Sequence, residues 1–333
     1  MKWYARVSAA GDIAVESCDV LVIGSGAAGL RAAISARSDP SIDVLVVSKC
    51  AVASPHSVMA EGGISVALGL ADPEDDAAQH RADTLLAGRY LNDPELVDRL
   101  VTEAPKRVQE AAAFGALFDR EAQTDSLVQR RGPGGGHTRS RALIAGDYIG
   151  FALLTGLLKE SRRRGVRMRS DLFILDLIHH ADAVRGATAI DLRTGRPFAL
   201  LAGATVLASG GAGQLYAITT NPAESTGDGY AIALRRGLQL RDMEQVQFHP
   251  TAGASPREAR GLLVTESMRG HGAVLRNVEG ERFMYRYDPE RMELSYRDVV
   301  ARAQLHRAHR GALVTKPRHH DHPRIWAHLG DEL

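Results

Sequence analysis

The chain has 333 residues, of which 44% are hydrophobic, so it can bury a sizeable core and form two or three domain-sized units. Its 41 basic and 40 acidic residues leave a net charge of +1, which excludes a general attraction to nucleic acid or to an acidic membrane surface. Its two cysteines stand in no CxxC or Cys/His spacing, which argues against a disulfide framework or a metal site, and no run of about 18 apolar residues predicts a membrane span.

The first two strands predict the opening of a βαβ unit. The stretch CDVLVIGSGAAGLRAAISA (18–36) begins as an apolar strand, turns at glycines and continues as a helix rich in Ala and Leu. IDVLVVSK (42–49) follows as a continuous apolar run, which is typical of a parallel strand covered on both faces. We therefore expect an α/β fold built on a doubly wound parallel sheet.

The later elements are less regular. Asp93 and Pro94 offer a helix start within a helix-rich stretch, whereas RRGPGGGHTRSR (130–141) breaks all periodicity and predicts a loop. Beyond residue 303 the chain becomes rich in histidine and arginine and loses its apolar periodicity, so we expect a poorly packed tail. The other expected elements are helices within 73–117, 147–163 and 227–237, strands near 166–178, 184–192 and 204–213, and a strand leading into a loop over 244–253.

The glycine turn after the first strand predicts a dinucleotide site. Gly24, Gly26 and Gly29 form G-x-G-x-x-G between a strand and a helix, which is the context that gives this pattern its meaning. The first glycine permits a tight turn, the second lets the backbone approach a pyrophosphate, and the third lets helix and strand pack closely. The second strand ends in Ser48 and Lys49 without the acid that usually binds a ribose of NAD, and this favours either an unusual ribose contact or a different dinucleotide, FAD.

Eight stretches spread over residues 18–303 together resemble one family closely. They are VLVIGSGAAGLRAAI, VVSK, HSVMAEGGISVALG, ASGGAGQLY, STGDGYAIALRRG, LRDMEQVQFHPT, LLVTESMRGHGAVLRN and ELSYRDVVARA. This is the family of the flavoprotein subunits of succinate dehydrogenase and fumarate reductase, which also includes the L-aspartate oxidases. Ser-Lys follows the second strand in that family, so the resemblance accounts for the missing acid.

The resemblance implies a Rossmann-like FAD-binding domain with an inserted α+β capping domain, and dicarboxylate chemistry at the flavin between them. It assigns residues 18–230 to the N-terminal part of the FAD-binding domain and 231–303 to part of the capping domain. Residues 304–333 have no counterpart, and we expect them to form an aberrant, disordered tail. Because the family continues well past this length, we expect a C-terminally truncated fragment, and an inactive one.

The FAD-binding residues are carried over from the resemblance position by position. Three glycines lie at the pyrophosphate, two residues at the adenosine end, and three along the isoalloxazine, and the ASGG and TGDG stretches complete the set. Asp228 can accept a hydrogen bond from a ribityl hydroxyl, although it also suits a helix N-cap. In that order the residues are Gly24, Gly26, Gly29, Ser48, Lys49, Ser57, Gly62, Gly63, Ala208, Ser209, Gly210, Gly211 and Asp228.

The resemblance also implies a dicarboxylate site, which needs cationic and hydroxyl donors in a dry cleft. His249, Thr265 and Glu266 fall on substrate positions of the family. Arg297 falls on the general acid or base, and Glu266 with Arg269 resembles its proton relay. Taken without the resemblance, His249 is more typical of a hydrogen-bonded loop histidine, and Arg297 of a surface cation.

One histidine distinguishes members within the family. Succinate and fumarate enzymes attach FAD through its 8α carbon to a histidine five residues before an acid, and His56 stands five residues before Glu61. Aspartate oxidases lack that histidine and carry a glutamate in an R-E-G-G-H-S loop, where this chain has Gly134 or a neighbour. Both differences favour covalent FAD and succinate or fumarate, while FGALFDRE resembles the aspartate oxidases and Pro55 replaces an expected serine. L-Aspartate oxidase and a soluble fumarate reductase with noncovalent FAD are the alternatives.

The expected partners also come from the resemblance. They are a small dicarboxylate substrate and an iron–sulfur subunit that passes electrons to quinone in a membrane-associated complex. We expect no nucleic acid, no resident metal and no direct membrane insertion. The location is then the cytoplasm or the inner face of the cell membrane, reached through partner subunits. A different hypothesis is that the chain is a truncated remnant without turnover.

Overall fold

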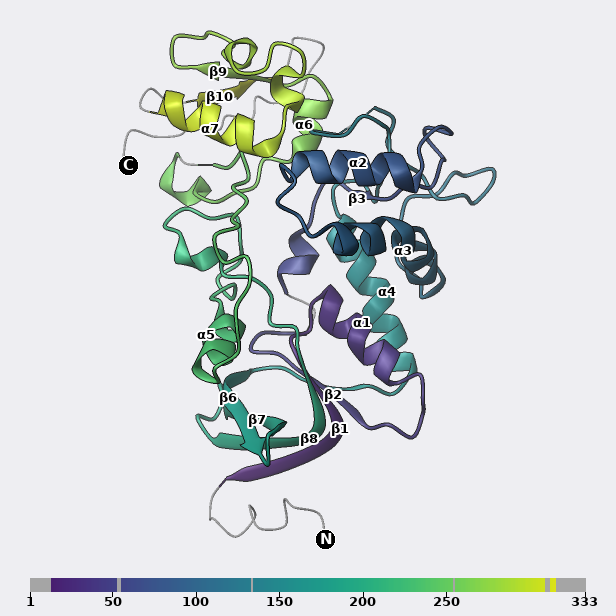
Figure 1. Cartoon of the computed structure of the whole chain (residues 1–333), viewed down its shortest axis with the longest axis vertical. Coiled ribbons are helices and arrows are strands. Elements are labelled where there is room, and N and C mark those ends of the chain that lie inside the picture. The colour runs from purple at the N-terminus through teal and green to yellow at the C-terminus, as the bar shows by residue number, and fades with distance from the viewer. Residues whose placement is uncertain (1–12, 53–54, 133, 254, 309–311, 316–333) are drawn as a thin grey trace.

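The computed structural model describes residues 13–52, 55–132, 134–253, 255–308 and 312–315. Figure 1 shows a large sheet at one end of the molecule, helices covering one side of it, and a small unit containing α6, α7 and β9 at the opposite end. A stretch with little regular structure links the sheet to the small unit along one side. Among the described residues, no helix is long and apolar enough to cross a membrane.

The large sheet is mixed. Its order is β5-β2-β1-β8-β7-β6, with parallel pairing from β5 to β8 and antiparallel pairing among β8, β7 and β6. The α/β class is confirmed, but the parallel arrangement holds for four of the six strands, because short turns join β6, β7 and β8 and such turns connect antiparallel strands. The strands are β1 (Ala14–Ile23), β2 (Val44–Val47), β5 (Arg167–Arg169), β6 (Leu172–His180), β7 (Ala183–Asp191) and β8 (Pro197–Leu207).

Three strand predictions change in detail. The strand expected near 166–178 is two strands on opposite edges of the sheet, separated at Asp171, whose φ is +61°. The strand expected near 204–213 ends at Leu207, so the ASGG stretch is a loop at the carboxyl end of β8. The strand expected over 244–253 is wrong: Ala252 makes an isolated bridge to Leu263, and the segment is otherwise without strand.

The predicted helices are present. Asp93 caps α3 by accepting from the backbone N–H groups of Glu95 and Leu96, with Pro94 in the first turn, as its dipeptide predicts. Helices α1 and α4 pack on each other through Leu30, Ile34, Leu154 and Leu157. The helices of this part are α1 (Ala27–Ala36), α2 (Ala77–Ala87), α3 (Pro94–Ala113), α4 (Ile149–Arg163) and α5 (Asp228–Arg235), and a two-stranded sheet pairs β3 (Ile64–Ser65) with β4 (Ala142–Leu143).

The small unit has a hydrophobic core of its own. It contains α6 (Glu266–Gly270), β9 (Val274–Asn277), α7 (Arg297–Ala308) and β10 (Ala312–Thr315), and β10 pairs with β9. The disordered tail expected from residue 304 is wrong for the described part of it, because α7 continues to residue 308 and residues 312–315 form β10. Residues 309–311 and 316–333 of the predicted tail lie outside the described residues. The boundaries expected for the capping domain stay predictions. The core residues are Val264, Ala273, Leu275, Phe283, Met284, Val300 and Ala303.

Candidate active site

The glycine loop after β1 is packed against backbone. A Cβ on Gly24, whose φ is +114°, would stand 2.1 Å from the carbonyl oxygen of Ala208. A Cβ on Gly29 would stand 1.9 Å from the carbonyl oxygen of Gly24. Only glycine fits at either position, because the obstructing atoms are backbone. The loop that precedes α1 and the ASGG loop that follows β8, both predicted to bind FAD, therefore lie in contact at the carboxyl ends of adjacent parallel strands.

Two distant residues predicted at FAD meet beyond the end of β2. Lys49 Nζ lies 2.5 Å from Asp228 Oδ2 and donates to Thr226 Oγ1 at 2.6 Å. Asp228 is the first residue of α5, and Gly227, with φ of +77°, occupies the cap position. Asp228 is therefore not the N-cap residue. Ser48, immediately before Lys49, is buried, and its Oγ lies 3.4 Å from Cys50 Sγ.

The loop predicted to run along the isoalloxazine joins the glycine loop to the small unit. Ser57 Oγ accepts from the backbone N–H of Ala27 at 3.2 Å, at the start of α1. His56 is exposed and opens a short 3-10 turn, His56–Met59, that packs on α4. A Cβ on Gly62 would stand 3.9 Å from both Thr265 Oγ1 and Ser267 Oγ. The predicted flavin loop and the predicted substrate residues thus face each other.

A carboxylate between two guanidinium groups marks the predicted substrate region. Glu266 Oε2 lies 3.4 Å from Arg269 Nη2 and 3.3 Å from Arg297 Nε. Glu266 Oε1 accepts from the backbone N–H of Gly135 at 2.8 Å. The side chain of Arg269 is 1% exposed and that of Arg297 is 40% exposed. The three charged groups, Arg269, Glu266 and Arg297, thus extend from the protein interior toward solvent.

Burial and neighbouring charges set the protonation states here. Burial alone would raise the pKa of Glu266, but Arg269 and Arg297 hold it below its usual value. Burial lowers the pKa of Arg269, and Arg297 adds to that effect. Burial, followed by the charges of Arg297 and Arg269, lowers the pKa of His249 to about 4. His249 is therefore neutral near pH 7, and its Nδ1 lies 2.9 Å from the carbonyl oxygen of Thr251.

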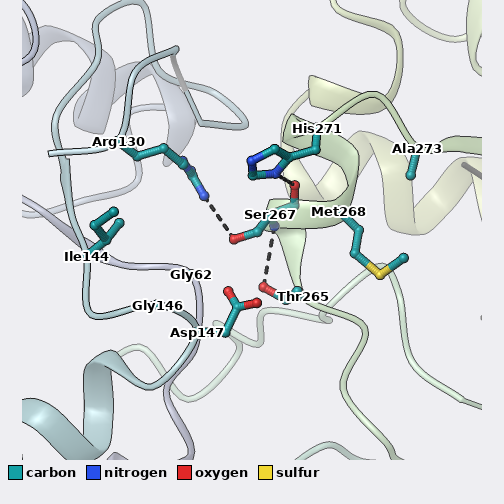
Figure 2. Close-up of a pocket in the computed structure, with 10 residues that line it drawn as sticks. All are labelled: Gly62, Arg130, Ile144, Gly146, Asp147, Thr265, Ser267, Met268, His271 and Ala273. Carbon is teal, nitrogen blue, oxygen red and sulfur yellow. Dashed lines mark hydrogen bonds between the residues drawn. The ribbon is translucent and has the colours of Figure 1, made fainter. Parts of the chain in front are cut away.

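A cavity of about 430 Å³ opens between the flavin loop and α6 (Figure 2). Of the residues predicted for the site, it is lined by Gly62 and Thr265. Four of its polar residues were not predicted: Arg130, Asp147, Ser267 and His271. Its remaining lining residues are Ile144, Gly146, Met268 and Ala273.

The loop over 130–141 reaches this site by way of a buried ion cluster. Arg141 is 1% exposed and pairs with Asp75 at 2.7 Å and with Asp83 at 3.0 Å. Asp83 also accepts from the backbone N–H of Thr138 at 3.0 Å. Breaking a buried pair of this kind would leave an uncompensated charge, so the cluster fixes the loop firmly. The loop in turn places the backbone N–H of Gly135 against Glu266.

Comparisons with known proteins agree with this geometry. A family model described as an FAD binding domain matches residues 19–326. The chain belongs to this FAD-binding family. It is 46% identical over 286 residues to a subunit of fumarate reductase (CoM/CoB) from Methanothermobacter marburgensis, covering 86% of this chain and 52% of that protein. It is 40% identical over 288 residues to L-aspartate oxidase of Neisseria meningitidis, covering 86% of this chain and 55% of that protein.

The fold is also that of known flavoproteins. A solved structure of a variant E. coli quinol fumarate reductase flavoprotein superposes with a TM-score of 0.83 at 31% identity, covering 91% of this chain and 54% of that one. The chain spans about half the length of the curated relatives it matches. It is thus homologous to fumarate reductase, succinate dehydrogenase and aspartate oxidase flavoproteins.

The residues of this FAD-binding chain suit the pyrophosphate of the cofactor. Ser25, inside the glycine loop, is 1% exposed, and its Oγ has no hydrogen-bond partner among the described residues. Gly26 precedes α1 and has no side chain to cap it, and the first N–H of the helix, that of Ala27, donates to Ser57 Oγ. A buried hydroxyl and the remaining N–H groups of a helix N-terminus are the donors that a pyrophosphate accepts from. The described residues contain no group of three or more His, Cys, Asp or Glu that could hold a metal.

Acid is expected to destabilise the FAD-binding chain through His80, next to the Arg141 cluster. His80 is 3% exposed, and its Nδ1 has no partner among the described residues. Burial, then Arg141 and His137, lower its pKa from 6.5 to about 4. Between these two values the unfolded chain binds a proton that the folded chain does not, so stability is complete above pH 6.5 and falls as the pH drops toward 4. The loss is at most about 3 kcal/mol.

Urea unfolding at pH 7.5 and at pH 5 measures this loss. His80→Asn removes one titrating group and is expected to reduce the pH dependence by the share of His80, leaving the share of His249, whose pKa is also lowered to about 4. The matched variant His179→Asn, in the exposed part of β6, should keep the full dependence. A His80→Asn protein with the full pH dependence of the wild type would show that another group carries it.

Proposed function

We propose that this chain is the FAD- and substrate-binding part of an oxidoreductase that interconverts succinate and fumarate. The observation that carries the proposal is the carboxylate of Glu266 held between Arg269 and Arg297, beside a cavity whose other wall includes Gly62. Dicarboxylate chemistry needs cations, hydroxyl donors and a proton path close to the flavin, and these features lie together in this region.

FAD, when bound, supplies the group that accepts or donates a hydride at N5. The chain's own residues handle the proton. Arg297 is the most exposed of the three groups, and in the proposal it gives or takes the proton at the carbon opposite the hydride. An arginine with a pKa above about 12 passes a proton readily only where its surroundings make the transfer downhill. The next group of that path is Glu266, whose Oε2 lies 3.3 Å from Arg297 Nε. The third is Arg269, whose Nη2 lies 3.4 Å from the same oxygen.

In the proposal, two neutral side chains beside this path, those of His249 and Thr265, bind the substrate. His249 is uncharged near pH 7. In the tautomer whose Nδ1 accepts from the backbone N–H of Thr251 at 3.3 Å, its Nε2–H can donate to a carboxylate without adding a charge that titrates in the working range. Thr265 adds a hydroxyl that faces Gly62. Both residues lie beside the guanidinium groups that neutralise the substrate, which is the arrangement that an anionic ligand requires.

Flavin spectroscopy tests the proposal directly. The resemblance alone predicts an inactive fragment, but the chain contains the proposed proton path of Arg297, Glu266 and Arg269, so we expect it to react. The purified chain, supplied with FAD under anaerobic conditions, is expected to bleach near 450 nm on adding succinate, since flavin absorbance is lost on reduction, and the chemically reduced protein is expected to recover it with fumarate. A chain that binds FAD but responds to neither dicarboxylate would overturn the proposal.

L-Aspartate oxidase is the second candidate, because the chain is 40% identical to the Neisseria enzyme over 86% of its length. The same assay separates the two. Bleaching by L-aspartate in preference to succinate would favour the oxidase, and the reverse preference would favour the succinate and fumarate reaction.

In the proposal the electrons pass to an iron–sulfur partner subunit of a complex at the inner face of the cell membrane. Its support is that relatives are named as subunits of fumarate reductase and succinate dehydrogenase. Isolating the tagged chain from its native cytoplasm and membrane fractions tests this, and a chain recovered alone from the soluble fraction contradicts it.

His56 is expected to carry FAD covalently. His56 is exposed at the start of its 3-10 turn, so its imidazole is accessible to a cofactor. Its neighbour Ser57 contacts the start of α1, where the cofactor is expected to lie. Acid precipitation of wild-type protein should leave the yellow colour in the pellet, whereas His56→Ala should release it to the supernatant. His179→Ala, at an exposed strand position, is the matched control and should behave as wild type. Colour released from wild-type protein contradicts the covalent bond.

A further inference from the structure

The cavity beside α6 contains a cation that the proton path does not use. Arg130 comes from the loop side of the cavity, and its guanidinium Nη1 donates to Ser267 Oγ at 2.9 Å (Figure 2). Its backbone N–H donates to the carbonyl oxygen of Ala142 at 2.8 Å. The preceding residue, Gln129, is buried and donates to the carbonyl oxygens of Val66 and Arg141. Hydrogen bonds therefore hold the backbone at Arg130 and the side chain of the residue before it.

Most of the guanidinium remains available to a ligand. A guanidinium has five N–H donors, and the hydrogen bonds of the described residues give this one a single acceptor, the hydroxyl of Ser267. Arg130 is half-buried, so its charge acts in surroundings that strengthen a hydrogen bond to an anion. A planar carboxylate matches this fork of donors in geometry and in charge.

The rest of the cavity suits one end of a short dicarboxylate. Ser267 and Thr265 present hydroxyls toward Gly62, and His271 Nδ1 lies 2.7 Å from the carbonyl oxygen of Ser267, which holds its ring over this end of the cavity. Ile144, Met268 and Ala273 supply apolar contact for a hydrocarbon chain.

Arg130 also lies close to the proposed proton path. A Cβ on Gly134 would stand 3.6 Å from Arg130 Nη2 and 3.4 Å from Glu266 Oε1. The two charged groups thus flank one point of the glycine loop. A carboxylate bound by Arg130 places the carbons of the ligand between the Gly62 loop and Glu266, where the proposed chemistry takes place.

We propose that Arg130, oriented by Ser267, binds one carboxylate of the dicarboxylate substrate in this cavity, an inference that rests on the proposed function.

Asp147 makes the two sides of the cavity differ in charge. It lines the same cavity and is exposed, and Figure 2 shows it on the Thr265 side of Ser267, away from Arg130. Its negative charge repels a carboxylate from that side, so the anion is directed to the Arg130 side.

A matched pair of ligands isolates the carboxylate contact. Succinate and butyrate have the same chain length, and butyrate carries a methyl group in place of the second carboxylate. Calorimetric titration of the full chain with saturating FAD gives the dissociation constant of each. Arg130→Gln is expected to weaken succinate binding about 10- to 100-fold, as expected for the loss of a charged hydrogen bond, and to change butyrate binding little. Arg130→Lys keeps the charge without the fork and should fall between.

Arg131→Gln is the control, because it makes the same charge change at an exposed neighbour that does not line the cavity. It should retain the wild-type preference for succinate. If the wild type prefers succinate and Arg130→Gln keeps that preference, the assignment of Arg130 is overturned while the proposed function stands. A wild type that binds succinate no more tightly than butyrate overturns both. Thermal midpoints verify folding, and if Arg130→Gln does not fold, Arg130→Lys and Ser267→Ala decide, since both should weaken succinate binding alone.

Discussion

Replacing Arg297 with glutamine is expected to lower kcat for succinate oxidation about 1,000-fold, the size of a lost acid–base group, while FAD remains bound. Arg297 Nε lies 3.3 Å from Glu266 Oε2, and Nη1 donates to Gln247 at 2.9 Å, so glutamine keeps part of the polar contact but cannot carry the proton. If the residue acts in the transition state, kcat and kcat/KM fall together. Steady-state kinetics and the visible spectrum of the variant measure both effects.

The control for this variant lies on the same helix. Arg302 pairs with Asp298, and its side chain is 61% exposed, so Arg302→Gln makes the same charge change on α7 away from Glu266. Its kcat should stay within about twofold of the wild type, because an exposed pair of this kind contributes at most about 1 kcal/mol. If Arg297→Gln turned over at a similar rate, another group would have to move the proton.

The opening of the fold was predicted from local sequence, whereas the direction of its later strands was missed. A continuous apolar run and a glycine spacing are signals within one segment, and β1, α1 and β2 lie where those signals indicate. Strand direction depends on the connection between strands. The signal that could have shown antiparallel pairing is the gap of residues 181–182 between β6 and β7, which is too short for a crossover helix.

The residues of the candidate site also divide into those that the sequence predicted and those that it did not. Glu266, Arg269 and Arg297 were predicted from the family resemblance, and they meet because α6 and the start of α7 belong to one small unit. Ser267 and His271 stand within the same motif, so their neighbours provided a signal. Arg130 had none, because it comes from a loop without periodicity and meets Ser267 through tertiary contacts alone. Its place depends on the buried Arg141 cluster, which spacing does not reveal.

Gly24→Ala is expected to destabilise the FAD-binding part and to abolish FAD binding. The added Cβ would lie 2.1 Å from the carbonyl oxygen and 2.7 Å from the carbonyl carbon of Ala208, and φ at this residue is +114°. Relief requires β1 and β8 to separate where they run parallel and hydrogen-bonded. Overpacking and backbone strain together cost about 3–5 kcal/mol. In a chain of this size that lowers the thermal midpoint by about 10 °C.

Gly270→Ala separates this effect from the general consequence of adding a methyl group. A Cβ on Gly270 meets no atom of the described residues within 4 Å, and the residue is helical, so alanine should leave the midpoint unchanged or raise it slightly. Calorimetry of the two variants and fluorescence titration with FAD measure stability and cofactor binding separately. Because β1 and β8 meet at Gly24, loss of FAD binding should accompany the fall in the midpoint. A Gly24→Ala protein with wild-type midpoint and FAD affinity would mean that the loop can move away from Ala208, and the close contact would then not be what requires glycine there.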